Sequence, residues 1–255
     1  MPEVLQAGLW GLLGGAALVL GALVAWFVRV PRTVIASVMA FGSGVLISAV
    51  AFDLVAEAAD TGGLGPTAVG FLGGAAAYLA ANALLARRGA RHRKRSGGEG
   101  PEQQPSEDEQ SGSGAAIAVG ALLDGVPESV VLGLGLLGGG SVSAPVLAAV
   151  VISNVPEGLS SAAGMKANGR SARYVFGVWG GIAVASGLSA LVGYALLGSA
   201  PPEAVAVITA VAAGAILTMV ADTMIPEAFE RTRTWTGLIT TVGFLAAFAI
   251  ERLGA

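Results

Sequence analysis

Long uncharged stretches of apolar residues, separated by short polar connections, make up most of the chain. A helix crosses a bilayer with about 20 apolar residues and satisfies its own backbone hydrogen bonds there. The pattern therefore predicts an all-α integral membrane protein with eight transmembrane helices. The predicted segments run at about 4–28, 34–58, 64–86, 114–138, 143–165, 174–199, 203–228 and 234–251.

The basic residues lie almost entirely in every second connection. Cytoplasmic connections of membrane proteins are enriched in Lys and Arg. If the N-terminus is outside, the inner connections hold every Lys and Arg except Arg252. We therefore expect a multi-pass protein of the cell (plasma) membrane with both termini outside.

The one long connection, residues 87–113, interrupts a single membrane domain formed by residues 1–86 and 114–255. It is basic at first and then acidic and polar, without apolar periodicity. Such composition predicts a disordered cytoplasmic loop, whose basic half is suited to anionic lipid. The alternative is that His92 and the nearby acids collect metal ions.

Composition narrows the function classes. Hydrophobic residues are 54% of the chain and charged residues 12%, with no cysteine and one histidine. The absence of cysteine excludes thiolate chemistry and zinc fingers. The chain has no basic domain, so we expect no nucleic-acid partner. The chain has no HExxH motif, which a metalloprotease would need. No signature of an aspartyl enzyme surrounds Asp124 or Asp222. We expect no enzyme activity and no cofactor.

Glycines spaced four residues apart occur in several segments, at Gly11/Gly15, Gly70/Gly74 and Gly135/Gly139. Small residues at this spacing let membrane helices approach closely. They predict a tight bundle and allow a homodimer.

Seven carboxylates fall inside the apolar segments, and no Lys, Arg or His is expected at a comparable depth. A charged residue at mid-membrane costs at least about 2.5–3.5 kcal/mol, and such residues mark ion or proton pathways. Either several are protonated, or a cation from outside balances them. Asp53 and Glu57 lie toward the outer end, and Asp222 and Glu227 toward the inner end, of a predicted pathway. The central residues are Asp124, Glu128 and Glu157.

The sequence Val-Pro-Glu occurs in two consecutive segments that run in opposite directions, which is an inverted local repeat. Pro127 and Pro156 each remove a backbone hydrogen bond and favour a kink. Residues four apart share a helix face. The two segments therefore predict a midplane cation site of three carboxylates, an amide and a hydroxyl, from Asp124, Glu128, Ser153, Asn154 and Glu157.

These motifs resemble the ZIP (Zrt/Irt-like protein) family of divalent-metal transporters. DGVPESVVLGLGLL (124–137) and SNVPEGLSSAAGM (153–165) are similar to its fourth and fifth helices. The family's second and seventh helices carry acidic segments, and two segments of this chain are similar to them, AFDLVAEAAD (51–60) and DTMIPEAFE (222–230). The resemblance implies a 3+2+3 bundle of eight helices, a cytoplasmic loop after the third helix, and transport of a divalent metal.

The chain departs from the family pattern at several ligand positions. Asp124 stands where the family typically has His, Gly125 where it has Asn, and Ser153 where His or Gln is common. The sixth segment offers only Ser186 and Ser189 where the family often has an acid, so we expect one metal ion. The resemblance favours zinc or a broad range of divalent metals, whereas an all-oxygen site favours manganese or iron. The alternative function is a non-transporting metal- or proton-binding membrane protein, such as a sensor or scaffold.

Overall fold

The computed structural model describes residues 1–90, 93–94, 104, 113–137 and 140–254, and these residues contain helices and no strand. The first half of the chain forms α1 (Glu3–Phe27), α2 (Arg32–Ala49), η1 (Val50–Val55), α3 (Ala56–Gly62), α4 (Leu64–Leu85), η2 (Ala86–Ala90) and α5 (Ser113–Leu134). The second half forms α6 (Ala144–Ala167), α7 (Ala172–Leu197), α8 (Pro202–Met219), η4 (Val220–Met224), α9 (Ile225–Thr232), η5 (Arg233–Trp235) and α10 (Thr236–Gly254).

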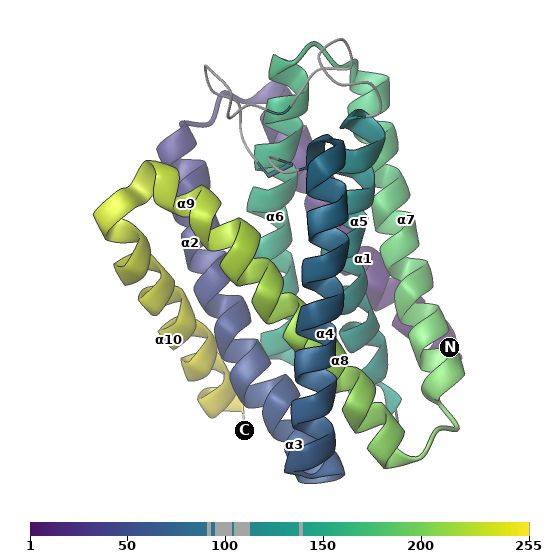
Figure 1. Cartoon of the computed structure of the whole chain (residues 1–255). Coiled ribbons are helices and arrows are strands. Elements are labelled where there is room, and N and C mark those ends of the chain that lie inside the picture. Colours follow the sequence, from purple (N-terminus) through teal and green to yellow (C-terminus); the bar gives the residue numbers. More distant parts are fainter. Residues whose placement is uncertain (91–92, 95–103, 105–112, 138–139, 255) are drawn as a thin grey trace.

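In the part of the chain that the structure describes, seven helical runs are long and apolar enough to cross a membrane, which makes this a multi-pass membrane protein. The first six agree with the predicted segments to within four residues. The predicted segments 203–228 and 234–251 instead form one run, Pro202–Leu253, of 52 residues. The chain reverses direction within this run at Arg233, whose φ is +45°, so α10 descends beside α2 (Figure 1).

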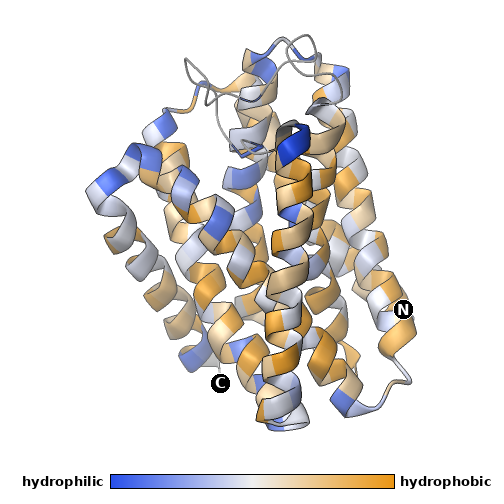
Figure 2. Cartoon of the chain, in the orientation of Figure 1, coloured by the Kyte–Doolittle hydropathy of each residue, from blue (hydrophilic) through white to orange (hydrophobic). Residues whose placement is uncertain are grey.

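Hydrophobic residues cover the lengths of the helices, and hydrophilic ones gather toward the ends of the bundle (Figure 2). The N- and C-termini lie at one end (Figure 1). The connections between α1 and α2, between α6 and α7, and around η5 lie at the other end, together with η2. These connections carry the basic residues that the charge pattern assigned to one side.

The helices form two packing groups. In the first, α1 packs against α5, α6 and α7; in the second, α4 packs against α8, and α2 packs against α9 and α10. The groups meet mainly where α2 contacts α6 and α5 contacts α8. The motif-bearing helices α5 and α6 therefore lie in one group and face the other.

Three pairs of parallel helices cross through the same reciprocal glycine contact (Figure 1). A Cβ at Gly158 would overlap the carbonyl oxygen of Leu18, and one at Gly21 would overlap that of Val155. In each pair the contacted carbonyl lies three residues before the partner's glycine. The other pairs are Gly44 with Gly243, between α2 and α10, and Gly74 with Gly214, between α4 and α8. Glycine at these positions allows a backbone approach that any side chain would block.

The small-residue pairs predicted from sequence have different outcomes. Gly11 and Gly15 pack against α7, and Gly70 and Gly74 pack against α8, as expected for a tight bundle. Both pairs are thus used within the chain and give no support to the homodimer, which stays a prediction. Gly139 lies outside the described residues.

The loop predicted over residues 87–113 differs from expectation wherever the structure describes it. Residues 86–90 extend α4 as η2, and Arg93, Lys94 and Gln104 are buried rather than solvated. The remaining residues of this segment up to 112, including His92 with its alternative metal-collecting role, lie outside the described residues.

The glycine crossing beside Glu157 gives a stability prediction. Gly158→Ala should destabilise the protein by about 1–3 kcal/mol, because its Cβ would overlap the α1 backbone and the helices would have to separate. Thermal unfolding in detergent measures this. Gly177→Ala is the matched control, because nothing lies within 4 Å of its Cβ. Equal melting temperatures for the two variants would contradict the close crossing.

Candidate functional site

Three carboxylates from α5 and α6 are buried inside the bundle. Asp124 and Glu128 are each 1% exposed and one turn apart on α5, and Glu157 on α6 is 3% exposed. Both helices continue through their internal prolines, Pro127 and Pro156. The three acids that the sequence places at the centre of these two helices are therefore buried side chains in the structure.

The carboxylate of Asp124 is held by a buried arginine. Arg93 donates from Nε to Oδ2 at 2.9 Å and from Nη2 to Oδ1 at 2.8 Å, the two-point geometry that suits a carboxylate best. The Tyr78 hydroxyl donates to the same Oδ1 at 2.5 Å and accepts from Arg93 Nη2 at 2.9 Å. Asn82, one turn after Tyr78 on α4, accepts from Arg93 Nη1 at 2.8 Å. Asp124 is therefore fixed from both α4 and the segment after it.

The ammonium group of Lys94 lies between Asp124 and Glu157. Its Nζ is 2.8 Å from Glu157 Oε2 and 3.3 Å from Asp124 Oδ2, and Lys94 is 3% exposed. Burial disfavours the charged ammonium, but the attraction of the two carboxylates outweighs it and holds the pKa of Lys94 above its usual value. A positive charge therefore sits where two of the central acids converge.

This arrangement corrects one prediction. No basic residue was expected at the depth of the central carboxylates, yet Arg93 and Lys94 pair directly with Asp124 and Glu157. The physical reason is that Arg93 and Lys94, which lie outside every apolar segment of the sequence, are themselves buried in the bundle and reach the acids. An external cation is thus not required to balance these two charges.

The backbone around the two basic residues is also held. The Ser160 hydroxyl donates to the carbonyl of Lys94 in a very short hydrogen bond. The Gln104 amide donates to the carbonyl of Arg93 at 2.9 Å and to that of Ser161 at 3.1 Å. These hydrogen bonds from side chains to carbonyl oxygens hold Lys94 and Gln104 against α6, in addition to the ion pair of Lys94 with Glu157.

Glu128 is the central acid without such a partner. Neither of its carboxylate oxygens, both buried, accepts a hydrogen bond from the described residues. The Ser153 hydroxyl lies near Glu128 and donates to the carbonyl of Val150 at 3.0 Å. A buried carboxylate in this condition is costly unless it is protonated or meets a cation.

The predicted ligand Asn154 makes a hydrogen bond to the backbone of another helix. Asn154 donates from its amide to the Gly14 carbonyl on α1 at 3.0 Å. Among the described residues, no three His, Cys, Asp or Glu side chains are grouped so that they could hold one metal ion. What the structure brings together is Asp124 and Glu157 around an ammonium group, with Glu128 one turn away from Asp124.

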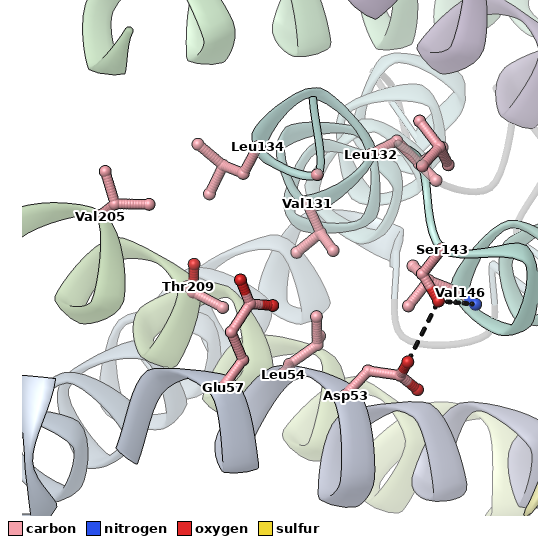
Figure 3. Close-up of a pocket in the computed structure, with 12 residues that line it drawn as sticks. Asp53, Leu54, Glu57, Val131, Leu132, Leu134, Ser143, Val146, Val205 and Thr209 are labelled. Carbon is pink, nitrogen blue, oxygen red and sulfur yellow. Dashed lines mark hydrogen bonds between the residues drawn. The ribbon is translucent and has the colours of Figure 1, made fainter. Parts of the chain in front are cut away.

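The predicted outer pair lines a cavity. Asp53 and Glu57 face a space of about 110 Å³ between α3, α5 and α8 (Figure 3). Asp53 Oδ1 accepts from Ser143 at 3.1 Å, while Oδ2 has no hydrogen-bond partner among the described residues. A second cavity of about 300 Å³ shares Glu57, Val205 and Thr209 with the first. Together they form a recess in the half of the bundle that holds the termini, lined mostly by apolar side chains, with Asp53, Glu57 and Thr209 among them.

The predicted inner pair lies on η4 and α9. Asp222 is exposed on η4, and Glu227 on α9 is half-buried. Both η1, which carries Asp53, and η4 are π-helical. Short π-helical segments within α-helices occur often at functional sites.

Sequence reasoning missed Tyr78, Asn82 and Gln104, and assigned Arg93 and Lys94 to lipid. A signal for the first two was present, because a Tyr and an Asn four residues apart share one face of an otherwise apolar helix. No signal in the sequence indicated that the basic segment is buried.

No protein-family model matches this chain, and no curated protein matches its sequence.

The Arg93–Asp124 pair gives a second stability prediction. Arg93→Gln should cost about 3–5 kcal/mol, because Asp124 would stay buried without its main cation. The double variant with Asp124→Asn should recover part of the loss, because no uncompensated charge remains. Thermal unfolding measures both. Arg88→Gln removes an exposed charge from the same basic stretch and serves as the control. Additive losses in the double variant would count against the pairing.

Proposed function

We propose that the chain carries a divalent metal cation across the membrane through a site formed by Asp124, Glu128 and Glu157, with Ser153 and Asn154 beside it. One observation carries this proposal. The ammonium of Lys94 lies within 3.3 Å of Asp124 and 2.8 Å of Glu157, so these carboxylates already bind a cation. The unpartnered carboxylate of Glu128 adds further negative charge for a divalent ion.

The cation reaches the site from the recess lined by Asp53 and Glu57. Leu132 also lines this recess and lies four residues, about 6 Å, from Glu128 along α5. A small displacement of α5 is therefore enough to join the recess to the site. The cation leaves past Asp222 and Glu227 at the other side.

The chain crosses the cell membrane eight times in a 3+2+3 order, with both termini outside. Support for eight crossings comes from the reversal at Arg233, since 52 helical residues in one direction would extend about 78 Å, far beyond a hydrocarbon core of about 30 Å. Support for the order comes from internal similarity. The second and seventh crossings both contain a π-helical segment with an aspartate, Asp53 or Asp222.

Access to the site alternates by movement of α1, α5, α6 and α7 against the other helices. The glycine contacts hold helices together within each group, while α5 and α6 lie where the groups meet. Transporters with midplane sites work by movement of one helix group against another.

A transport assay tests the site. Glu128→Gln and Glu157→Gln should each abolish uptake of divalent cations into proteoliposomes, because the amide keeps the shape of the side chain but removes the charge that holds the ion. Glu203→Gln, an exposed acid at the start of α8, should leave uptake unchanged. Full uptake by both site variants would reject the proposal.

The chemistry of the donors predicts weak selectivity. Carboxylate, amide and hydroxyl oxygens suit Mn²⁺ and Fe²⁺, whereas zinc prefers nitrogen and sulfur ligands. Competition of each ion against radioactive Mn²⁺ uptake measures this, and we expect half-inhibition by Mn²⁺, Fe²⁺ and Zn²⁺ at concentrations within about tenfold of each other. A sharp preference for zinc would contradict an all-oxygen site.

A second function, a non-transporting metal- or proton-binding membrane protein, is favoured by the internal pairing of Arg93 and Lys94 with the acids. Residues balanced in this way can serve stability alone. This alternative predicts binding of cations by the purified protein without flux into proteoliposomes.

A further inference from the structure

The end of the bundle opposite the termini carries basic residues that are separate from the central acids. The connection from α1 to α2 and the connection from α6 to α7 both lie at this end (Figure 1). No Asp or Glu occurs in residues 4–52 or 158–202. In and beside the two connections lie Arg29, Arg32, Lys166, Arg170 and Arg173. The two connections therefore carry positive charge and no negative charge.

Lys166 joins the end of α6 to the end of α1. Its Nζ donates to the carbonyl oxygen of Trp26 at 2.6 Å and lies 5.1 Å from the centroid of the Trp26 ring. The face of a tryptophan ring attracts a cation, so this exposed ammonium has a defined position. An ammonium has three N–H donors, and two of them have no acceptor among the described residues. The charge is therefore positioned, with donors open to a ligand.

Aromatic rings form the apolar side of the same place. The Trp26 ring packs edge-on against the ring of Phe176 on α7, with 5.9 Å between the centroids. Phe27, the last residue of α1, is 75% exposed. Tryptophan is enriched where membrane proteins pass from the hydrocarbon to the headgroups. The ammonium of Lys166 therefore lies beside apolar rings at the depth expected for lipid headgroups.

Two exposed arginines flank these residues. Arg173 lies three residues before Phe176 on α7, so their side chains share one face of the helix. Arg29 follows Trp26 by three residues, just after α1 ends. Neither arginine forms an ion pair with a carboxylate of the described residues. Their charges are therefore not neutralised by the described part of the chain.

These five side chains form one corner of the bundle, the interfacial corner, which consists of Trp26, Arg29, Lys166, Arg173 and Phe176. We propose that the interfacial corner binds the headgroup phosphate of one anionic phospholipid. The open donors of Lys166 meet the phosphate oxygens, and the aromatic rings contact the glycerol and the first carbons of the acyl chains. A zwitterionic headgroup brings a cation of its own, which the arginines repel. The lipid binds whether or not the chain carries a metal ion.

The size of the preference follows from the number of charges. Basic pockets between membrane helices bind acidic headgroups, and each basic residue near an anionic surface strengthens binding about fivefold. Lys166, Arg29 and Arg173 together predict a preference of about a hundredfold for an anionic over a zwitterionic lipid. Because the corner draws residues from α1, α6 and α7, the bound lipid also holds together the ends of three helices of one packing group.

The first experiment measures the apparent dissociation constant of the first bound lipid by native mass spectrometry of the purified full chain in detergent. Dioleoyl phosphatidylglycerol should bind about a hundredfold more tightly than dioleoyl phosphatidylcholine. Lys166→Gln should weaken phosphatidylglycerol binding about fivefold, whereas Lys166→Arg, which keeps the charge, should not. Arg252→Gln is the matched control, because Arg252 lies over the ring of Phe248 at the opposite end of the bundle.

A second variant keeps the test independent of folding. Arg173 is exposed and makes no hydrogen bond with the described residues, so Arg173→Gln should fold normally and also weaken phosphatidylglycerol binding about fivefold. Equal affinity for the two lipids, or undiminished affinity in both glutamine variants, would overturn the proposal. An excess of inorganic phosphate should leave the lipid bound. Its displacement would show that the corner binds phosphate ions rather than a lipid.

The second experiment locates the lipid by fluorescence. Bromine atoms on the acyl chains quench a tryptophan that they approach, so brominated phosphatidylglycerol should quench the protein more than brominated phosphatidylcholine does. This difference should vanish in Trp26→Phe, which keeps an aromatic ring beside Lys166. It should persist in Trp235→Phe, the matched control, because Trp235 is 65% exposed on η5 at the same end of the bundle. A difference that survives Trp26→Phe would place the lipid elsewhere and overturn the assignment.

Discussion

Negative charge buried in an apolar bundle is the constraint around which the centre of this protein is organised. Asp124, Glu128 and Glu157 lie where water is scarce, and an isolated ionised carboxylate in such surroundings is strongly destabilising. Arg93 and Lys94 offset this cost for two of the three acids by direct ion pairs. The polar residues of α4, Tyr78 and Asn82, then fix the arginine that makes the first pair.

The backbone geometry that allows these pairs depends on small residues. Gly158, next to Glu157, lies against α1 so closely that a side chain would displace the helix. Gly120 similarly leaves space for the stem of Arg93. Packing and electrostatics are therefore linked, because glycines lie both at the crossing of α1 with α6 beside Glu157 and against the side chain of Arg93.

The site lies where two helix groups join, with a recess on one side and the Arg93–Lys94 segment on the other. The recess, lined by Asp53 and Glu57, ends one turn from Glu128. The polar contacts of Gln104 and Ser160 hold the segment on the opposite side.

Much of the architecture was determined by the sequence alone. Apolar stretches of membrane-spanning length predict the first six membrane-spanning helices closely, because helix length and hydropathy are local properties. The Val-Pro-Glu repeats likewise identified the buried acids, because a carboxylate within an apolar stretch can be recognised without knowing its neighbours. Only the tertiary structure decided what those acids contact. Arg93 and Lys94 belong to a polar segment with no periodicity, and their burial depends on carboxylate partners 30 to 63 residues away in the sequence, a long-range pairing that local patterns cannot encode.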